Sequence, residues 1–300
     1  MKKILIALAV AVCSLALSLE VRAEKDKNTL EKIANSKEIN IGYRTTSIPL
    51  SFAVGDGPPQ GYSIDISQQV VAKVGKTLNL PDLKVNYHKI TPQDRIEMVQ
   101  NGTIDFECSV TTITPERLAQ VGFSRPFYVT SLTFLYNEDK SGVIDTSMDL
   151  KGRTVALVKG TTGEFFLQKR NLDLGLNLNF VVVHDNNEAL EMLEQGKVTA
   201  IFQDDVQLAG LRARSAMASK LVMVAKPEHS EPFGCVYRHG DDQFGAIINS
   251  ALADFAKSDG LTVSYRKWFV YPIDSLGGIE LKMPMSKGTR EARDALKGGS

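Results

Sequence analysis

The sequence predicts an α/β protein in which parallel sheets are flanked by helices. Short apolar runs of strand length alternate along the chain with amphipathic segments of helix length. Polar residues follow several of these runs, where the carboxyl ends of parallel strands meet at one edge of a sheet and ligands bind. The 300 residues are 43% apolar and 23% charged, which is typical of a soluble globular protein with room for two lobes.

The first hundred residues predict a regular succession of elements. Tyr43 and Arg44 stand where the first strand ends, and Arg95 is expected one turn inside a helix that Thr91 caps. The predicted elements are a helix over 30–36, a strand over 39–42, a turn over 55–61, a helix over 63–78, a strand over 85–90 and a helix over 92–101.

Residues 102–128 carry the strongest signal for a binding site. A buried strand is expected over 104–110, with Thr112 just beyond it. Thr114 is then the N-cap of a helix whose first turn contains Arg117. A carboxylate there would meet unpaired backbone N–H groups, the positive end of the helix dipole and a guanidinium group together. The alternative is an arginine in a surface salt bridge.

The rest of the chain continues the alternation. Thr162 and Gly163 lie in a strand–Gly–Thr–Thr–helix segment, which can hold an anion but lacks the Lys-Ser/Thr end of a P-loop. Asp204 stands at a strand tip. The predicted elements are strands over 128–136, 154–159, 180–183, 198–202 and 233–237, a helix that starts near Glu164 and carries 165–167, helices over 187–195, 242–258 and 263–269, and a packed tail after 269 that frays over 297–300.

The N-terminus predicts export. A positive start at 1–3, an apolar run over 4–19 and small residues at 21–23 fit a signal peptide over 1–23 that is cleaved after Ala23. A membrane anchor is the alternative, but the run is shorter than the roughly 20 residues of a span. Cleavage removes three basic residues and one acidic residue, so the 35 of each become 32 and 34. This balance gives no reason to expect nucleic acid or an anionic membrane as a partner.

Cys108 and Cys235 are the cysteines that remain after cleavage. Thiols in an oxidising compartment often pair, and neither cysteine has a His or second Cys spaced for zinc, so we expect a disulfide and no metal site. Two separate buried thiols are the alternative.

The motif D-F-E-C-x-x-T-T-x-x-x-E-R over 105–117, followed by F-S-x-P-F-Y over 123–128, resembles the family 3 solute-binding proteins of polar amino-acid ABC importers, and among them the glutamate/aspartate binders. The resemblance runs from about Leu30 to the end of the chain. It implies the type II periplasmic-binding-protein fold, in which two lobes close over one cleft. The lobes would be 24–129 with 233–300, and 130–232, joined by crossings at 128–136 and 233–237.

The resemblance also implies a set of ligand contacts. Arg117 would bind the α-carboxylate of an amino acid, with help from Thr112 and the loop at Thr162 and Gly163. Asp204 would bind the ammonium group, since one buried carboxylate offsets one buried cation.

A side-chain carboxylate would meet Arg44 and Arg95, with the hydroxyl of Thr91 nearby. These arginines could instead be solvated, and Thr91 and Asp204 could be helix caps. Val110 stands where the family has a serine, and Asn186 where it has a histidine, so the preference for acidic ligands is the weakest part of the resemblance.

Three functions compete at this point. The resemblance implies a monomeric periplasmic protein that delivers its ligand to a membrane permease, with no cofactor and no catalysis. Dehydratases of prephenate-like acids share the fold and would need a general acid, for which Glu107 and Glu164 are candidates. No Ser-His-Asp order or metal-ligand spacing supports an enzyme. The sensing domain of a receptor would be followed by a membrane span, which we do not expect.

Overall fold

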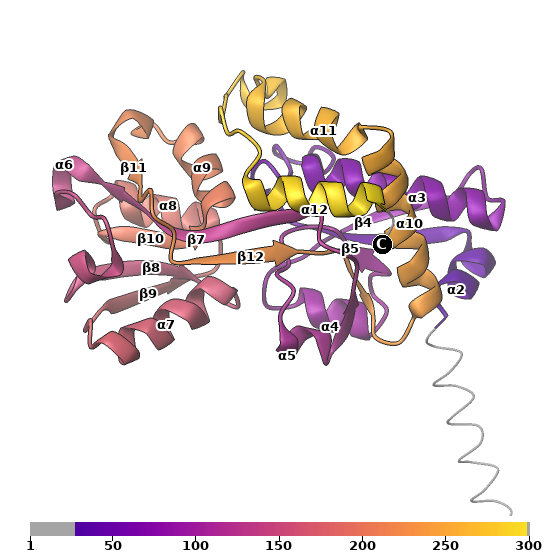
Figure 1. Cartoon of the computed structure of the whole chain (residues 1–300), viewed down its shortest axis with the longest axis horizontal. Coiled ribbons are helices and arrows are strands. Elements are labelled where there is room, and N and C mark those ends of the chain that lie inside the picture. Colours follow the sequence, from indigo (N-terminus) through magenta and orange to yellow (C-terminus); the bar gives the residue numbers. More distant parts are fainter. Residues whose placement is uncertain (1–27, 299–300) are drawn as a thin grey trace, which may run out of the picture.

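The computed structural model describes residues 28–298 and has two lobes, each built around its own sheet. Two long strands run between the lobes, as Figure 1 shows. The two-lobed α/β architecture predicted above is confirmed. The predicted signal peptide over 1–23 lies outside the described residues.

The strands are β1 Glu38–Tyr43, β2 Thr46–Ser47, β3 Ser51–Phe52, β4 Lys84–Lys89, β5 Phe106–Glu107, β6 Val121–Phe123, β7 Tyr128–Asn137, β8 Thr154–Val158, β9 Asn179–Val183, β10 Ala200–Asp204, β11 Leu221–Met223, β12 His229–Phe233 and β13 Val236–Arg238. The α-helices are α2 Thr29–Ser36, α3 Tyr62–Leu78, α4 Arg95–Gln100, α5 Pro115–Leu118, α6 Glu138–Ser141, α7 Thr162–Leu174, α8 Asn186–Glu194, α9 Asp205–Arg214, α10 Asp242–Lys257, α11 Gly260–Tyr265 and α12 Lys287–Gly298. Short 3-10 helices cover Ser147–Leu150, Ala218–Lys220 and Asp274–Leu276, and a π-helical turn covers Arg266–Val270.

The sheet of the first lobe has the strand order β4-β1-β5-β13-β6. Its first three strands are parallel, whereas β13 runs antiparallel to both of its neighbours. Helices α3 and α10 cover one face, where Val70 and Ile248 join the same buried apolar cluster. Helix α4 covers the other face through Val99, which packs with Val236 of β13. The sheet is therefore buried on both faces, as its parallel part requires.

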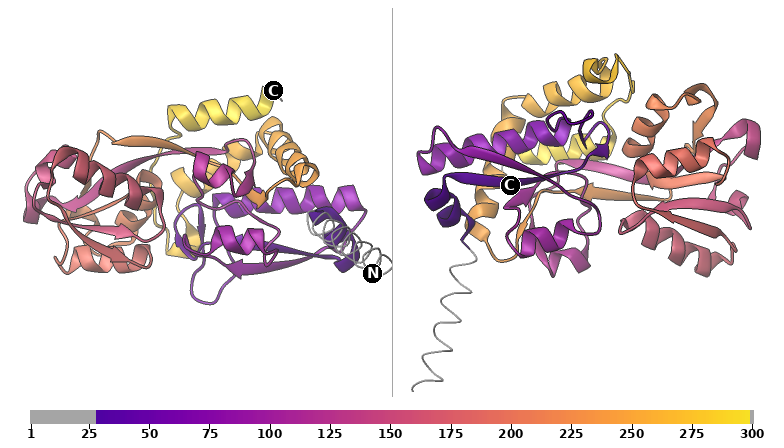
Figure 2. Two further views of the ribbon diagram at one scale, coloured as in Figure 1. Left: turned by 90° about the horizontal axis from the view of Figure 1, so that it is seen from below. Right: turned by 180° about the vertical axis from the view of Figure 1, so that it is seen from behind.

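The sheet of the second lobe has the order β11-β7-β10-β8-β9, with β12 also on β7. Leu167 of α7 packs on one face with Phe202, and Leu190 of α8 packs on the other with Ile201. Figure 2 shows the same separation of helices from two further directions. Strands β8, β9 and β10 are parallel, whereas β7, β11 and β12 pair antiparallel. Both sheets are thus mixed rather than mostly parallel. A chain that leaves a lobe and returns along the same connection runs in opposite directions, so its two passes pair antiparallel.

The return crossing lies earlier along the chain than predicted. Strand β12 pairs with β7 from His229 opposite Leu132 to Phe233 opposite Tyr128, whereas Val236–Arg238 forms β13 of the first sheet. The prediction of 233–237 as the return crossing was therefore wrong. The sequence H-S-E-P-F has too little apolar character to predict a strand, because this ribbon joins two lobes instead of crossing a core.

Two elements beside the cleft also differ from the prediction. Only Phe106–Glu107 of the run 104–110 forms a strand. Beyond it, the Glu107 carboxylate accepts hydrogen bonds from the Ser109 N–H and the Thr111 hydroxyl, so a side chain replaces the strand ladder. Helix α4 begins at Arg95 instead of near Pro92, because Thr91 Oγ1 accepts from two backbone N–H groups of a preceding turn.

The predicted frayed tail contains α12, which packs on α10 and on β7. Thr289 is buried, and its hydroxyl both accepts from the Val129 N–H and donates to the Val129 carbonyl, each at 3.1 Å. The sequence K-G-T-R-E-A-R-D-A-L-K-G is amphipathic but has very few apolar residues, so no helix was predicted there. None of the helices between residues 28 and 298 is long and apolar enough to cross a membrane.

Candidate functional site

The residues predicted to bind a ligand follow the carboxyl ends of parallel strands in both sheets. In the first lobe, Arg44 comes after β1, Arg95 after β4 and Thr112 after β5. In the second lobe, Thr162 opens α7 after β8, and Asp204 ends β10. The strand ends of the two lobes face each other, which the hydrogen bonds below demonstrate.

Three sets of contacts join the lobes at these ends. Gln93 Nε2 donates to the Lys159 carbonyl at 2.9 Å, and Ser47 Oγ donates to Gln207 Oε1 at 2.9 Å. The hydroxyl oxygens of Thr112 and Thr162 are 3.3 Å apart. The lobes are therefore closed on each other, and the side chains between them are shielded from solvent.

The three predicted arginines are enclosed cations. Arg44 is 4% exposed and Arg95 3%, whereas Arg117 is half-buried. Arg95 Nη1 donates to the Val110 carbonyl and Arg117 Nη1 to the Thr112 carbonyl, each at 2.9 Å. The surface alternatives for Arg44 and Arg95 are therefore wrong. Among the described residues, Arg95 Nε is one of the few buried polar atoms without a hydrogen-bond partner.

Burial sets the electrostatics of these arginines. It lowers the pKa of Arg44 to about 10, although Glu107 and other carboxylates oppose the shift. Burial and then the charge of Arg117 lower the pKa of Arg95 well below its ordinary value. Burial also lowers the pKa of Arg117, against the charge of Glu231. Cations crowded out of water in this way favour a nearby anion.

Asp204 is the acidic group in this cluster with spare hydrogen-bonding capacity. Gln207 Nε2 donates to Oδ2 at 2.6 Å, whereas Oδ1 is buried without a partner among the described residues. Burial, followed by the charge of Glu231, raises the pKa of Asp204 to about 8. Asp204 stands at the N-cap position of α9, but its side chain makes no capping hydrogen bond there. A cation beside Oδ1 would satisfy this oxygen and favour the ionised form.

The other predicted residues contribute no charge to this cluster. Asn186 Nδ2 donates to Gln207 Oε1 at 2.8 Å and lies 3.5 Å from the Thr46 carbonyl in the opposite lobe. Thr91 is exposed, and its hydroxyl oxygen accepts hydrogen bonds from two backbone N–H groups of the turn before α4. Val110 contributes its carbonyl to Arg95. Gly163 is buried in the first turn of α7.

Glu231 was missed by the sequence reasoning. This buried residue of β12 accepts hydrogen bonds at Oε2 from Thr112 Oγ1 at 2.7 Å and from Thr162 Oγ1 at 2.6 Å. One signal could have found it. A disulfide between Cys108 and Cys235 places the residues just before Cys235 beside those just after Cys108.

The two candidates for a general acid have local roles. Burial raises the pKa of Glu107, but its carboxylate holds the turn after β5 through Ser109 and Thr111. Glu164 accepts from the Gly160 N–H at 2.7 Å and so closes the loop before α7. Both carboxylates are used to hold the backbone of their own loops.

Cys108 and Cys235 form a disulfide bond, so the predicted pairing is confirmed and the alternative of two free thiols is wrong. The bond lies between the segment that follows β5 and the one that precedes β13. It therefore fixes Thr112 and β12 relative to each other at the base of the cleft.

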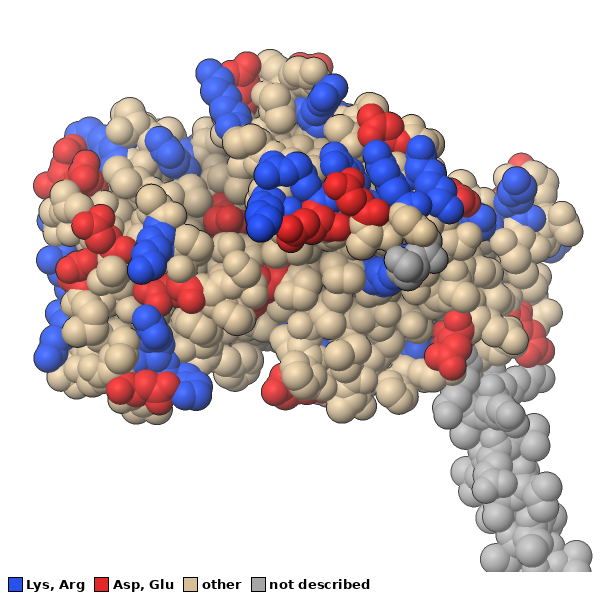
Figure 3. Space-filling view, in the orientation of Figure 1, with Lys and Arg blue, Asp and Glu red and all other residues tan. Residues whose placement is uncertain are grey.

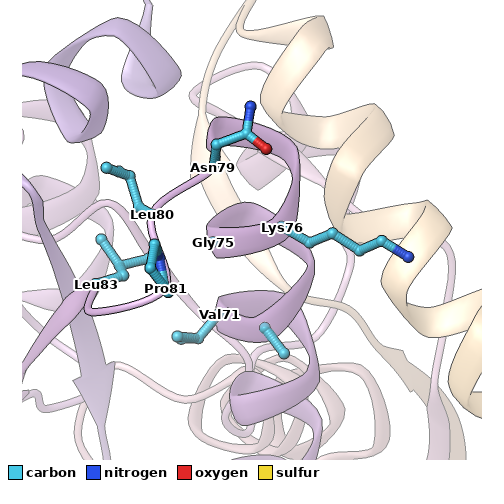
Figure 4. A pocket seen from close by; sticks show the side chains of 8 residues that line it. Val71, Gly75, Lys76, Asn79, Leu80, Pro81 and Leu83 are labelled. Carbon is cyan, nitrogen blue, oxygen red and sulfur yellow. The ribbon is translucent and has the colours of Figure 1, made fainter.

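One hollow of the surface, beside α3, lacks this cluster of buried charges. The hollow in Figure 4, of about 430 Å³, lies between the end of α3 and the loop that follows it. Leu80, Pro81 and Leu83 face Val71 there, whereas Lys76 extends to the opposite side of the helix. On the face shown in Figure 3, acidic and basic side chains are intermixed over both lobes. The buried cluster of Arg44, Arg95, Arg117, Asp204, Glu107 and Glu231 is the candidate binding site.

Two lobes that enclose charged groups at their strand ends are typical of a solute-binding protein. Residues 39–271 match the model of the bacterial extracellular solute-binding proteins, family 3, and the chain belongs to this family.

Two relatives and one solved structure illustrate the similarity. The chain is 38% identical to an L-glutamate/L-aspartate-binding protein of Pseudomonas aeruginosa, over 93% of this chain and 92% of the relative. It is 36% identical to a glutamate/aspartate import solute-binding protein of Escherichia coli K12, over 88% and 89%. A mutant of ArgBP from T. maritima superposes with a TM-score of 0.70 at 26% identity, over 80% of this chain and 98% of that one.

Proposed function

We propose that the protein is the substrate-binding component of an ABC importer and that it binds an acidic amino acid, glutamate or aspartate, between its lobes. The observation that carries this proposal is the cluster of buried Arg44, Arg95 and Asp204 with the half-buried Arg117. The names of the relatives from P. aeruginosa and E. coli support the same ligand class.

The ligand contacts follow from the chemistry of each group. Arg117 binds the α-carboxylate, together with backbone N–H groups at Thr112 and at the start of α7, Thr162 and Gly163, because the two threonine hydroxyls donate to Glu231. Asp204 binds the ammonium group through Oδ1, which has no hydrogen-bond partner in the described chain. The side-chain carboxylate binds Arg44 and Arg95, and the site is lined further by Thr91, Val110 and Asn186.

The charge of the site supports a ligand with two carboxylates. Arginine remains cationic near neutral pH, even at the lowered pKa of Arg44. Burial raises the pKa of Glu107, and it raises that of Asp204 to about 8, so Asp204 offsets the arginines incompletely near neutral pH. A net negative amino acid therefore compensates the three arginines better than a neutral one.

The same proposal covers location and partners. The signal peptide over 1–23 directs the protein to the periplasm, where it acts as a monomer and passes its ligand to a membrane permease. Residues 24–129 with 233–300 move as one lobe, and 130–232 as the other. Binding needs no cofactor and no catalysis, in keeping with the structural roles of Glu107 and Glu164.

Calorimetric titration of the mature protein with glutamate, aspartate, glutamine and arginine tests the proposal. Glutamine has a neutral amide where glutamate has a carboxylate, so Arg44 and Arg95 lose their anion. Loss of a charge-assisted hydrogen bond costs roughly 1.5–3 kcal/mol, so glutamate should bind about ten- to a hundredfold more tightly. Equal or stronger binding of glutamine would overturn the assignment. Mass spectrometry of ligand that co-purifies with native protein provides an independent check.

A further inference from the structure

Glu231 occupies the middle of the ribbon that joins the lobes. It lies opposite Thr130 in the pairing of β12 with β7, and it is 5% exposed. Its Oε2 atom accepts the two short hydrogen bonds from Thr112 and Thr162 described above. Each hydroxyl has a single proton, and both protons go to the same carboxylate oxygen. Glu231 lies on the ribbon of β7 and β12 that joins the lobes, and it therefore accepts hydrogen bonds from both lobes at once.

The bond from Thr112 is fixed by the backbone around it. Thr112 forms a β-bridge with Phe233, and the Ile113 N–H donates to the Pro232 carbonyl at 2.9 Å. The Gly234 N–H donates to the Thr111 carbonyl at 3.2 Å on the other side of this bridge. Thr112 therefore stays next to Glu231 whether the lobes are apart or together.

The bond from Thr162 depends on the position of the second lobe. Thr162 is the first residue of α7, which Thr161 caps and which packs on the second sheet through Leu167. The neighbouring loop also reaches the first lobe, where the Lys159 carbonyl accepts from Gln93. Thr162 therefore meets Glu231 and Thr112 together only when the start of α7 approaches the first lobe.

We propose that Glu231 is a latch residue, a positioning residue that stabilises the closed arrangement by accepting hydrogen bonds from Thr112 of one lobe and Thr162 of the other. The latch therefore stabilises the closed arrangement of the ligand-free protein. It also places a negative charge beside Arg117, whose cationic form it favours. Its effect on affinity rests on the proposed function, whereas its effect on closure does not.

Glu228 offers a matched control on the same segment. It is also a mostly buried carboxylate, but its partners are the Ser147 N–H and Arg170, both in the second lobe. Glu228→Gln therefore removes a charge of the same kind without touching a contact between the lobes.

The experiment measures closure of the full mature chain without ligand. Spin labels at the exposed positions of Leu118→Cys on α5 and Leu172→Cys on α7 report the distance between the lobes. Glu231→Gln and Thr162→Val should each shift the ratio of closed to open molecules about tenfold toward open. The double variant should open no further than Glu231→Gln alone, because both changes break the same bond. Glu228→Gln should leave the distance distribution unchanged.

Three results would overturn the latch. These are an unchanged distance distribution in folded Glu231→Gln, additive opening in the double variant, or equal opening in Glu228→Gln. Glutamate titration then separates this proposal from the function. If the wild-type protein binds none of the tested amino acids, the proposed function fails, and the distances without ligand still decide the latch. If it binds glutamate, Glu231→Gln and Thr162→Val should each weaken binding about tenfold.

Discussion

Arg95 and Arg117 are alike in chemistry but differ in position. Both donate from Nη1 to a backbone carbonyl, yet Arg95 opens α4 and Arg117 lies in α5 after the strand end at Thr112. The charge of Arg117 also lowers the pKa of Arg95, so the two cations are close enough to compete for one anion. A ligand with two separated carboxylates satisfies both.

Arg95→Ala and Arg117→Ala should therefore change affinity in different ways. Arg95→Ala should narrow the gap between glutamate and glutamine, because only glutamate brings an anion to this position. Arg117→Ala should weaken both ligands together, about ten- to a hundredfold, since both carry the α-carboxylate. Calorimetric titration of each variant with both amino acids measures these effects. A loss confined to glutamate in Arg117→Ala would contradict the assignment.

Asp204 should make ligand binding depend on pH. Its pKa of about 8 means that the free site holds a proton near neutral pH, whereas an ammonium group beside Oδ1 lowers this pKa. Binding then releases a proton, so glutamate affinity should rise as the pH increases from 6 to 8. Calorimetry in two buffers with different ionisation enthalpies counts the protons. Absence of proton release would contradict the role of Asp204.

The same group has an opposite effect on the stability of the ligand-free protein. A carboxyl group with a raised pKa binds its proton more tightly when folded than when unfolded. The stabilisation that protonated Asp204 adds to the free energy of unfolding is complete below the ordinary pKa of about 3.9, and it is lost as the pH rises through about 8. Asp204→Asn serves as the control, because it should remove this part of the pH dependence of unfolding.

The residues of the site were only partly predictable. Thr112 and Asp204 could be found because they follow apolar runs at strand ends, and Arg117 because it lies in the first turn of a helix that Thr114 caps. Glu231 could not be found, because a carboxylate in a short polar strand has the pattern of a solvent-exposed residue, and Glu107 was expected in a longer buried strand that the turn at 109–111 replaces. Their roles depend on partners that are distant in sequence, or on a turn that the strand pattern conceals.

At the scale of elements, the disulfide is the strongest local constraint beside the cleft. It joins residues 127 positions apart, and a cross-link of this kind restricts the unfolded chain. Replacing Cys108 and Cys235 with serine should lower the free energy of unfolding by roughly 2–4 kcal/mol. Urea unfolding measures the change, and reduction of the wild-type protein should reproduce it. An unchanged midpoint in both experiments would contradict the expected contribution.

The elements that were predicted correctly share a clear apolar pattern. Helix α3 and strand β8 belong to this group, because α3 buries one apolar face in the core of the first lobe and β8 is buried on both faces of the second sheet. Strand β12 and helix α12 have few apolar residues, since β12 forms part of the ribbon between the lobes and α12 buries only Thr289 and Leu296. Backbone pairing and a few buried contacts such as Thr289 position these elements instead.

At the scale of the whole molecule, the alternation of strands and helices predicted the α/β class, and the motif around Arg117 implied two lobes. The mixed character of the sheets was not predictable, because strand direction follows from how the chain passes between the lobes. Apolar periodicity has no information about direction. The antiparallel ribbon of β7 and β12 exists only because one lobe is inserted within the sequence of the other.

This insertion gives the disulfide a topological consequence. Every strand of the second sheet, from β7 to β12, lies between Cys108 and Cys235 in sequence, so the bond closes a covalent ring around that entire lobe. A protease that cuts one exposed loop of the second lobe would open the ring without releasing a fragment. The nicked protein would migrate as one chain without reductant and as two with it, and the two pieces would remain held together at the base of the cleft.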